Sequence, residues 1–89
     1  MKYEGIGVYI LFCKNGRYYI GSTDEIGRRY VEHQKGYVKA TKNLLPVSLV
    51  FFQKCDTLTD ARSLENRLKK YKSRKIIEQI ISDGYIKGV

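Results

Sequence analysis

The pattern of apolar positions along the chain begins with two short runs that flank an Asn-Gly pair. Gly7–Cys13 and Tyr18–Gly21 are rich in aromatic and β-branched residues, which favour strands. Asn15-Gly16 between them is typical of a tight turn between antiparallel strands. These positions predict a β-hairpin near the start of the chain.

The length of the hairpin loop decides where two tyrosines lie. A two-residue turn at Asn15-Gly16 would place Tyr9 and Tyr19 on opposite faces of the hairpin. A three-residue loop with Gly16 in the left-handed conformation pairs Tyr9 with Gly21 and brings both tyrosines to one face, as diagonal neighbours. We predict the second register. It leaves no side chain opposite Tyr9, so a phosphate could approach the backbone at Gly21.

A helix is predicted next, from about residue 24 to residue 35. Ser22 and Glu25 have the spacing of a capping box, which marks the start of a helix. Apolar and aromatic side chains then recur at helical intervals as far as Tyr37. Gly36 is suited to end the helix, because glycine readily adopts the left-handed conformation found there.

The second half of the chain contains one strand and two helices. Pro46 introduces the run Val47–Gln53, whose apolar residues occupy both faces, and such a run predicts a central strand. Thr57 and Ser73 are suited to cap two helices, of which the second ends at Gly84. The side chains predicted to face inward are Ala61, Leu64, Leu68 and Tyr71 in the first of these helices and Ile76, Ile77, Ile80 and Ile81 in the second.

The order β-β-α-β-α-α predicts the fold class. Short antiparallel strands combined with helices form an α+β fold, in which the helices cover a small three-stranded antiparallel sheet. A chain of 89 residues has room for one modest hydrophobic core and no second domain. We therefore expect residues 1–89 to form a single domain.

Charge and composition narrow the classes of function. The 17 Lys and Arg residues against nine Asp and Glu residues give a net charge of +8, which favours a polyanionic partner such as nucleic acid or an anionic membrane. No apolar run approaches the length of a membrane span, so we expect no membrane protein. Cys13 and Cys55 lack the spacing of a zinc site, and we expect buried, reduced thiols. Met1–Glu4 leads into the first strand without a signal peptide, and we place the protein in the cytoplasm.

Two triplets in the hairpin combine with three polar residues on the predicted helices. The triplets are Gly7-Val8-Tyr9 and Tyr19-Ile20-Gly21, and the polar residues are Arg29, His33 and Glu65. Over nearly the whole chain, these elements in this order resemble the GIY-YIG nuclease family, whose first triplet has Ile where this chain has Val. Arg29 and His33 look like the family's Arg and His (or Tyr) pair, and Glu65 looks like its metal-binding Glu.

The resemblance implies hydrolysis of DNA phosphodiester bonds by in-line attack of water. Tyr9, helped by Tyr19 or His33, would act as the base, and which of these takes the proton stays open. Arg29 would stabilise the transition state, because its planar fork suits phosphate oxygens. It stands one helical turn before His33, which favours it over its neighbour Arg28.

The resemblance also implies one divalent cation, Mg²⁺ or Mn²⁺. Glu65 would bind it as a hard oxygen ligand, with water and phosphate completing the coordination shell. Some members of the family have Lys directly after the second triplet, where this chain has Ser22. A cation for the leaving group would then come from Lys35, Lys39, Lys69 or the metal.

The segment from Arg62 to Lys75 carries seven basic residues against one acid, Glu65. Charge runs are usually solvated helix faces, but this density beside a candidate metal ligand favours a track for phosphates. The residues expected to contact nucleic acid are Gly21, Lys35, Lys39, Arg67, Lys69, Lys70 and Lys72.

Plainer interpretations compete with the functional ones. Tyr9 and Tyr19 could be ordinary sheet aromatics, and His33 could be a packed histidine. Glu65 could form an exposed ion pair with Lys69, four residues later on the same helix. We favour a bound cation, because Glu65 borders the apolar stripe, where an unpaired charge is costly.

The function predicted from the sequence is a metal-dependent endonuclease that acts in repair or processing of branched or damaged DNA. No segment of the chain reads as a separate targeting domain, so a partner protein, self-association or DNA shape would supply selectivity. The alternative is a nucleic-acid-binding module without catalysis that uses the same basic surface. Both hypotheses predict binding that weakens steeply with salt, so only an assay of cleavage distinguishes them.

Overall fold

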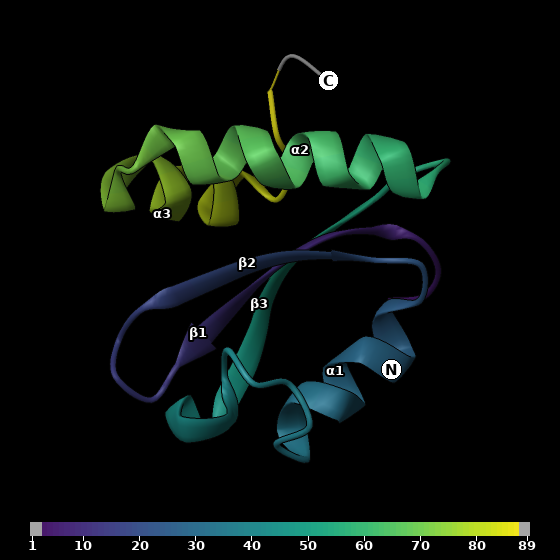
Figure 1. The fold of residues 1–89 in the computed structure, drawn as a ribbon. Helices are drawn as coiled ribbons and strands as arrows, with labels where there is room; N and C mark the ends of the chain where they lie inside the picture. The colour runs from purple at the N-terminus through teal and green to yellow at the C-terminus, as the bar shows by residue number, and fades with distance from the viewer. Residues whose placement is uncertain (1–2, 88–89) are drawn as a thin grey trace.

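The computed structural model describes residues 3–87 and has the predicted order of elements, with one short 3-10 helix in addition (Figure 1). Met1 and Lys2, part of the stretch predicted to lead into the first strand, lie outside the described residues. The strands are β1 (Gly7–Cys13), β2 (Tyr18–Thr23) and β3 (Val47–Lys54). The helices are α1 (Ile26–Gln34), η1 (Lys42–Leu44), α2 (Leu58–Tyr71) and α3 (Arg74–Asp83).

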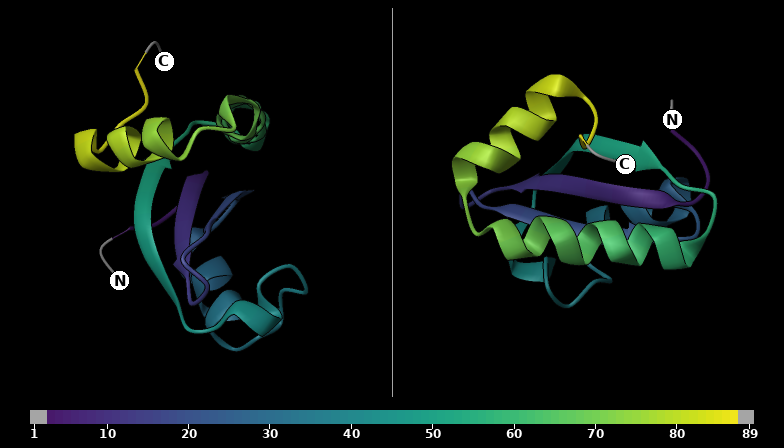
Figure 2. Two further views of the ribbon diagram at one scale, coloured as in Figure 1. Left: turned by 90° about the vertical axis from the view of Figure 1, so that its left-hand side faces the viewer. Right: turned by 90° about the horizontal axis from the view of Figure 1, so that it is seen from above.

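The three strands form an antiparallel sheet with the order β2-β1-β3, which confirms the predicted α+β class. The central strand is β1, so the prediction that the third strand is central is wrong. Helices α2 and α3 lie on one face of the sheet and α1 lies on the other (Figure 1, Figure 2). Because both faces are covered, β3 carries apolar residues on both faces although it lies at an edge.

The hairpin has the predicted register. Tyr9 pairs with Gly21, and Leu11 pairs with Tyr19. Gly16 has a φ of 82°, as the three-residue loop requires. Tyr9 and Tyr19 therefore lie on the same face of the sheet, the face that α1 covers.

Each face of the sheet has its own hydrophobic core. Alternate residues of β1 supply the two cores, because successive side chains of a strand point to opposite faces. The cluster under α2 and α3 consists of Val8, Ile10, Phe51, Leu64, Leu68, Ile77, Ile80 and Ile86. The cluster on the α1 side consists of Tyr9, Leu11, Cys13, Ile26 and Val47.

Helix α1 begins later than the sequence predicts. Its N-cap is Glu25, whose carboxylate accepts a hydrogen bond of 3.1 Å from the Gly27 amide. The capping box predicted at Ser22 does not form, because β2 continues to Thr23 and keeps Ser22 in the sheet. The predicted end is confirmed: Gly36 follows the helix with a φ of 77°.

The caps of α2 and α3 agree with the sequence. The Thr57 hydroxyl accepts a hydrogen bond of 3.1 Å from the Asp60 amide at the start of α2. Ser73 caps α3 in the same way, and Gly84 ends that helix with a φ of 82°. These residues fix the ends of the two helices that cover one face of the sheet.

One residue predicted to face inward on α3 does not. Ile77 and Ile80 are buried and Ile81 packs against them at the edge of the core, whereas Ile76 is 42% exposed. Consecutive helical residues lie about 100° apart around the axis, so a helix that turns Ile77 towards the sheet turns Ile76 aside.

Residues 3–87 contain neither a disulfide nor a helix suited to span a membrane. Cys13 is buried as expected, whereas Cys55 is only partly buried, and neither forms a disulfide there. In the same part of the chain, no helix combines the length and the apolar character that crossing a membrane requires.

Candidate active site

Tyr9 occupies the middle of the candidate site. It lies on the central strand, and its side chain is 1% exposed beneath α1. Its hydroxyl oxygen lies 2.8 Å from Nε2 of His33. The ring also covers Gly21, where an added Cβ would lie 2.5 Å from the Tyr9 hydroxyl. The space above Gly21 therefore receives Tyr9, and the prediction that a phosphate approaches the backbone there is wrong.

His33 is fully buried and bonded through both ring nitrogens. Its Nδ1 lies 2.7 Å from the hydroxyl oxygen of Thr41, which belongs to the loop between α1 and η1. The pKa of His33 is lowered to about 4, mainly by burial and further by the positive charge of Arg29, while the charge of Glu32 opposes the shift. The imidazole is therefore neutral at physiological pH.

The phenol of Tyr9 is protonated at physiological pH. The pKa of Tyr9 is raised to about 12, mainly by burial; the guanidinium of Arg29 opposes this rise, and the nearby Tyr19 and Glu65 contribute to it. These contributions place Arg29, Tyr19 and Glu65 within electrostatic reach of the same hydroxyl. Among them, only Arg29 favours the phenolate.

Tyr19 completes a cluster of three rings. Its ring centroid lies 6.3 Å from that of Tyr9 and 5.2 Å from that of His33, both in tilted or edge-on arrangements. The ring is only half-buried, because β2 is an edge strand. Tyr19 is therefore the one phenol of the pair that meets solvent.

Arg29 and Arg28 point to different surroundings. The guanidinium of Arg29 lowers the pKa of Tyr9 and forms an ion pair of 3.1 Å with Glu32. Arg28 lies on the exposed side of α1 and pairs with Asp24 and Glu32. The geometry favours Arg29 as the arginine of the site.

Glu65 approaches from α2, on the other face of the sheet. Its Oε1 accepts a hydrogen bond of 2.5 Å from the Ser22 hydroxyl, and its Oε2 lies 2.5 Å from Nζ of Lys69. The side chain is 19% exposed. The ion pair with Lys69 exists, so the argument that Glu65 is an unpaired charge in need of a cation is wrong.

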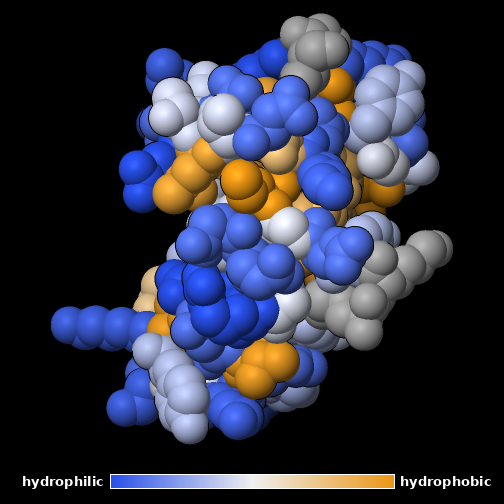
Figure 3. Space-filling model, turned by 90° about the vertical axis from the view of Figure 1, so that its right-hand side faces the viewer, coloured by the Kyte–Doolittle hydropathy of each residue, from blue (hydrophilic) through white to orange (hydrophobic). Residues whose placement is uncertain are grey.

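Two hollows lie along β2, and each is lined by a residue that contacts Glu65. One, of about 610 Å³, has Tyr19 and Lys69 in its lining. The other, of about 190 Å³, has Ser22 and Arg29 in its lining. Figure 3 shows the end of the molecule where β2 leads into α1, and hydrophilic side chains gather over it. The candidate site therefore straddles the edge strand rather than lying on one face.

The fit of a divalent cation rests on one carboxylate. Within residues 3–87 no group of three His, Cys, Asp or Glu side chains is arranged to hold a metal ion. Mg²⁺ does not need such a group, since it is commonly held by one or two carboxylates with water and substrate phosphates. Glu65 suits that arrangement, but a cation on Oε2 would have to displace Lys69.

The predicted nucleic-acid contacts separate into different surfaces. The guanidinium of Arg67 donates hydrogen bonds to the Tyr71 hydroxyl (2.9 Å) and to the Lys87 carbonyl oxygen (2.7 Å). Lys70 lines the same side of α2 as Arg67, whereas Lys69 and Lys72 line the hollow beside Tyr19. Lys35 and Lys39 are exposed in the segment that follows α1.

Sequence reasoning missed two residues of the site. Ser22 was predicted to cap a helix and stands where some members of the family have Lys, but in the structure it binds Glu65. Thr41 was not singled out, because it lies in an irregular loop and no spacing connects it with His33. The alternation in β2 could have identified Ser22, since it shares a face with Tyr18 and Ile20, which pack under α2 and α3.

Comparisons with known proteins identify the family to which the chain belongs. The family described as "GIY-YIG catalytic domain" matches residues 5–77. The chain is 35% identical over 78 residues to a UPF0213 protein of Staphylococcus saprophyticus, covering 86% of this chain and 94% of the relative. A UPF0213 protein of Streptococcus pneumoniae is 38% identical over 78 residues, covering 86% and 78%.

A third UPF0213 protein, from Haloquadratum walsbyi, is 37% identical over 78 residues and covers 86% of each chain. No solved structure matches the chain. The match over residues 5–77 includes both triplets, Arg29, His33 and Glu65. On this evidence the chain belongs to the GIY-YIG family of nucleases.

Proposed function

We propose that this protein is a metal-dependent endonuclease that hydrolyses phosphodiester bonds in DNA. The observation that carries the proposal is the buried chain of contacts from Tyr9 through His33 to Thr41. Buried polar networks are costly unless they are fully bonded, and this one lies beside an arginine and within reach of a carboxylate. Such a constellation suits proton transfer at a phosphate better than it suits packing.

The hydrogen bonds imply a direction for the protons. Within residues 3–87 the contact with Nδ1 of His33 is the one hydrogen bond that the buried Thr41 hydroxyl forms. If Thr41 donates to Nδ1, then Nε2 carries the proton of the neutral imidazole and donates to the Tyr9 oxygen. The hydrogen of Tyr9 then points away from His33, where it can be lost.

Tyr9 is the base in this scheme, and His33 is a donor that stabilises the phenolate. Arg29 also favours the phenolate, and a bound phosphate would hold Arg29 against its oxygens, where negative charge grows during attack. Tyr9 must first lose its own proton to bulk water, and the phenolate that results then takes a proton from the attacking water. Glu65 would hold the cation, which when bound neutralises the leaving oxygen.

The substrate class and the ion are part of the proposal. We expect Mg²⁺ or Mn²⁺ as the cation and branched or damaged DNA as the substrate, with a partner protein, self-association or DNA shape giving selectivity. The resemblance to the GIY-YIG family supports DNA as the substrate. The net charge of +8 agrees with a polyanion.

A second candidate is a nucleic-acid-binding module without catalysis. The observation that favours it is the state of Glu65, whose two oxygens are held by Ser22 and Lys69. A carboxylate held in this way can stabilise the packing of α2 on the edge strand without any metal.

Cleavage assays distinguish the two candidates. Nicked, flapped and supercoiled DNA would be incubated with Mg²⁺ or Mn²⁺ and the wild type, Glu65→Ala or Arg29→Ala. Loss of cleavage in both variants with binding retained supports the nuclease. Glu78→Ala and Arg28→Ala are matched controls, since both residues form exposed ion pairs on helices, and both variants should cleave normally. Absence of cleavage by the wild type on every substrate favours the binding module.

A further inference from the structure

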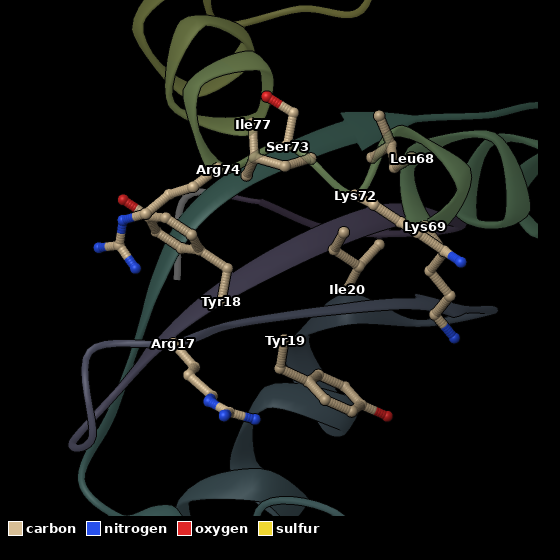
Figure 4. Close-up of a pocket in the computed structure, with 10 residues that line it drawn as sticks. All are labelled: Arg17, Tyr18, Tyr19, Ile20, Leu68, Lys69, Lys72, Ser73, Arg74 and Ile77. Carbon is tan, nitrogen blue, oxygen red and sulfur yellow. The ribbon is translucent and has the colours of Figure 1, made fainter.

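The larger hollow beside the site is a groove with a basic rim and an apolar floor. It has a volume of about 610 Å³ and lies between β2 and the junction of α2 with α3 (Figure 4). Its floor is formed by the aliphatic side chains of Ile20, Leu68 and Ile77. Its basic residues are Arg17, Lys69, Lys72 and Arg74, and no acidic residue lines it. We name it the β2 groove.

The four basic residues of the β2 groove have different roles. Arg74 is structural: it donates to the Gly16 carbonyl oxygen at 2.6 Å, pairs with Glu78 and lies over the ring of Tyr18. Lys69 binds Glu65. Among the described residues, no hydrogen bond or ion pair engages the side chain of Arg17 or of Lys72. These two cations are available to a ligand.

Lys72 occupies an unusual backbone position. It ends α2 with a φ of 48°, in the left-handed region that is strained for residues with a side chain and is most often taken by glycine at this place. It is the one residue other than glycine with a positive φ in the part of the chain that the structure describes. Strained positions tend to cluster at functional sites. A lysine here carries its charge into the groove.

The groove is continuous with the candidate active site. Tyr19 lines it, and Lys69 connects it with Glu65. In Figure 4 the ammonium groups of Lys69 and Lys72 extend from α2 towards the side of the groove that Tyr19 borders. A strand whose scissile phosphate lay at Glu65 would thus meet the groove with its neighbouring nucleotides.

The geometry points to a single-stranded flank of the DNA substrate as the ligand of the β2 groove. Arg17 and Lys72 would bind its phosphates, and the half-buried ring of Tyr19, which lines the groove, would stack with unpaired bases. A duplex keeps its bases stacked inside and presents only phosphates to the groove. The position of the scissile phosphate rests on the function proposed above, whereas binding to the groove does not require cleavage.

Binding without cleavage tests this inference. The affinity of the intact protein for a labelled single-stranded oligonucleotide would be measured by fluorescence anisotropy in EDTA over a range of salt concentrations. Arg17→Ala combined with Lys72→Ala should weaken binding at least about tenfold and reduce the log-log salt slope by about 1.4, as two lost contacts with a single strand imply. Lys42→Ala combined with Lys54→Ala removes equal charge from exposed residues outside the groove, and should leave the slope nearly unchanged.

The outcomes are separable from those of the nuclease test. If both double variants weakened the affinity for the oligonucleotide equally, the effect would be one of net charge alone. That result would contradict binding in the groove. An equal loss of affinity for duplex and single-stranded DNA would overturn the assignment of a single strand. If the protein cleaves no DNA but its affinity depends on the groove residues, the groove proposal is supported and the nuclease proposal is contradicted.

A glycine at position 72 gives an independent test. Lys72→Gly relieves the strained backbone and removes the charge, so the melting temperature should rise by about 4 °C while binding weakens. A merely structural lysine would show the first effect without the second. That result would count against the groove.

Discussion

The two faces of the sheet are built from the same strand but differ in chemistry. Under α2 and α3, the buried side chains of the core are apolar and make no specific polar contacts. Beneath α1, the buried set includes Tyr9, His33 and Thr41, joined by hydrogen bonds. Strand β1 supplies both, with Val8 and Ile10 on one side and Tyr9 on the other.

The contrast separates stability from chemistry. An aliphatic face gains free energy from the burial of apolar area without requiring precise partners. A buried polar face gains little net free energy, and it persists only when every group is bonded. Within residues 3–87 no buried side-chain nitrogen or oxygen lacks a partner. The polar face can therefore carry the side chains of a functional site, because burial of apolar side chains on the other face supplies the stability of the fold.

The largest expected effect is on the rate of cleavage, and it should distinguish two tyrosines on opposite faces of the sheet. Tyr9→Phe keeps the ring over Gly21 and removes only the hydroxyl that contacts His33, and we expect a loss of cleavage of about 10³-fold. Tyr18→Phe removes a hydroxyl that bonds exposed Glu78 on the other face, and cleavage should change less than about threefold. Initial rates on one DNA substrate measure both, and similar losses would contradict the division between faces.

The next effect concerns stability and the aliphatic face. Leu68 is 1% exposed beneath α2, and Leu68→Ala should lower the free energy of unfolding by about 3 kcal/mol. Val31→Ala is a suitable control, because Val31 is exposed on α1, and its effect should stay within about 0.5 kcal/mol. Urea denaturation measures both. An equal effect at the two positions would argue against a stabilising core under α2.

The polar face should also make stability depend on pH. The pKa of His33 is about 4 in the folded chain, below the ordinary value of 6.5, so the folded state prefers the neutral ring. As the pH falls from 7 to 5, the unfolded chain binds a proton that the folded chain does not, and stability should fall by about 2 kcal/mol. Urea denaturation of the wild type and of His33→Gln isolates this contribution, which the variant should lack.

The smallest effect tests the contact between Thr41 and His33. Thr41→Val preserves the shape of the side chain but removes the donor to Nδ1, so the imidazole should no longer hold its proton on Nε2 alone. We expect Thr41→Val to lower the rate of cleavage about tenfold. Thr41→Ser keeps the hydroxyl and should cleave at nearly the wild-type rate. Ring-nitrogen NMR shifts of His33 report the tautomer. A wild-type protein with an unprotonated Nε2 would contradict the proposed direction of the protons.

Local patterns in the sequence predicted much of the fold. The Asn-Gly pair and the positions of Tyr9 and Tyr19 indicated the hairpin register, because the period of a strand is fixed at two residues. Thr57, Ser73 and Gly84 marked helix ends, because capping depends on nearby backbone groups. Ile76 was misplaced, since an isoleucine run contains no signal for the angle at which its helix meets the sheet.

The sequence by itself determined the order of elements, the sharing of one face by Tyr9 and Tyr19, and the membership of the GIY-YIG family, because each depends on local spacing or on motifs. Only the tertiary structure decided that β1 is central, that Ser22 holds Glu65 and that Thr41 reaches His33. The physical reason is distance along the chain. Contacts between residues far apart in sequence depend on how elements pack, and packing follows from the whole set of buried surfaces rather than from any one segment.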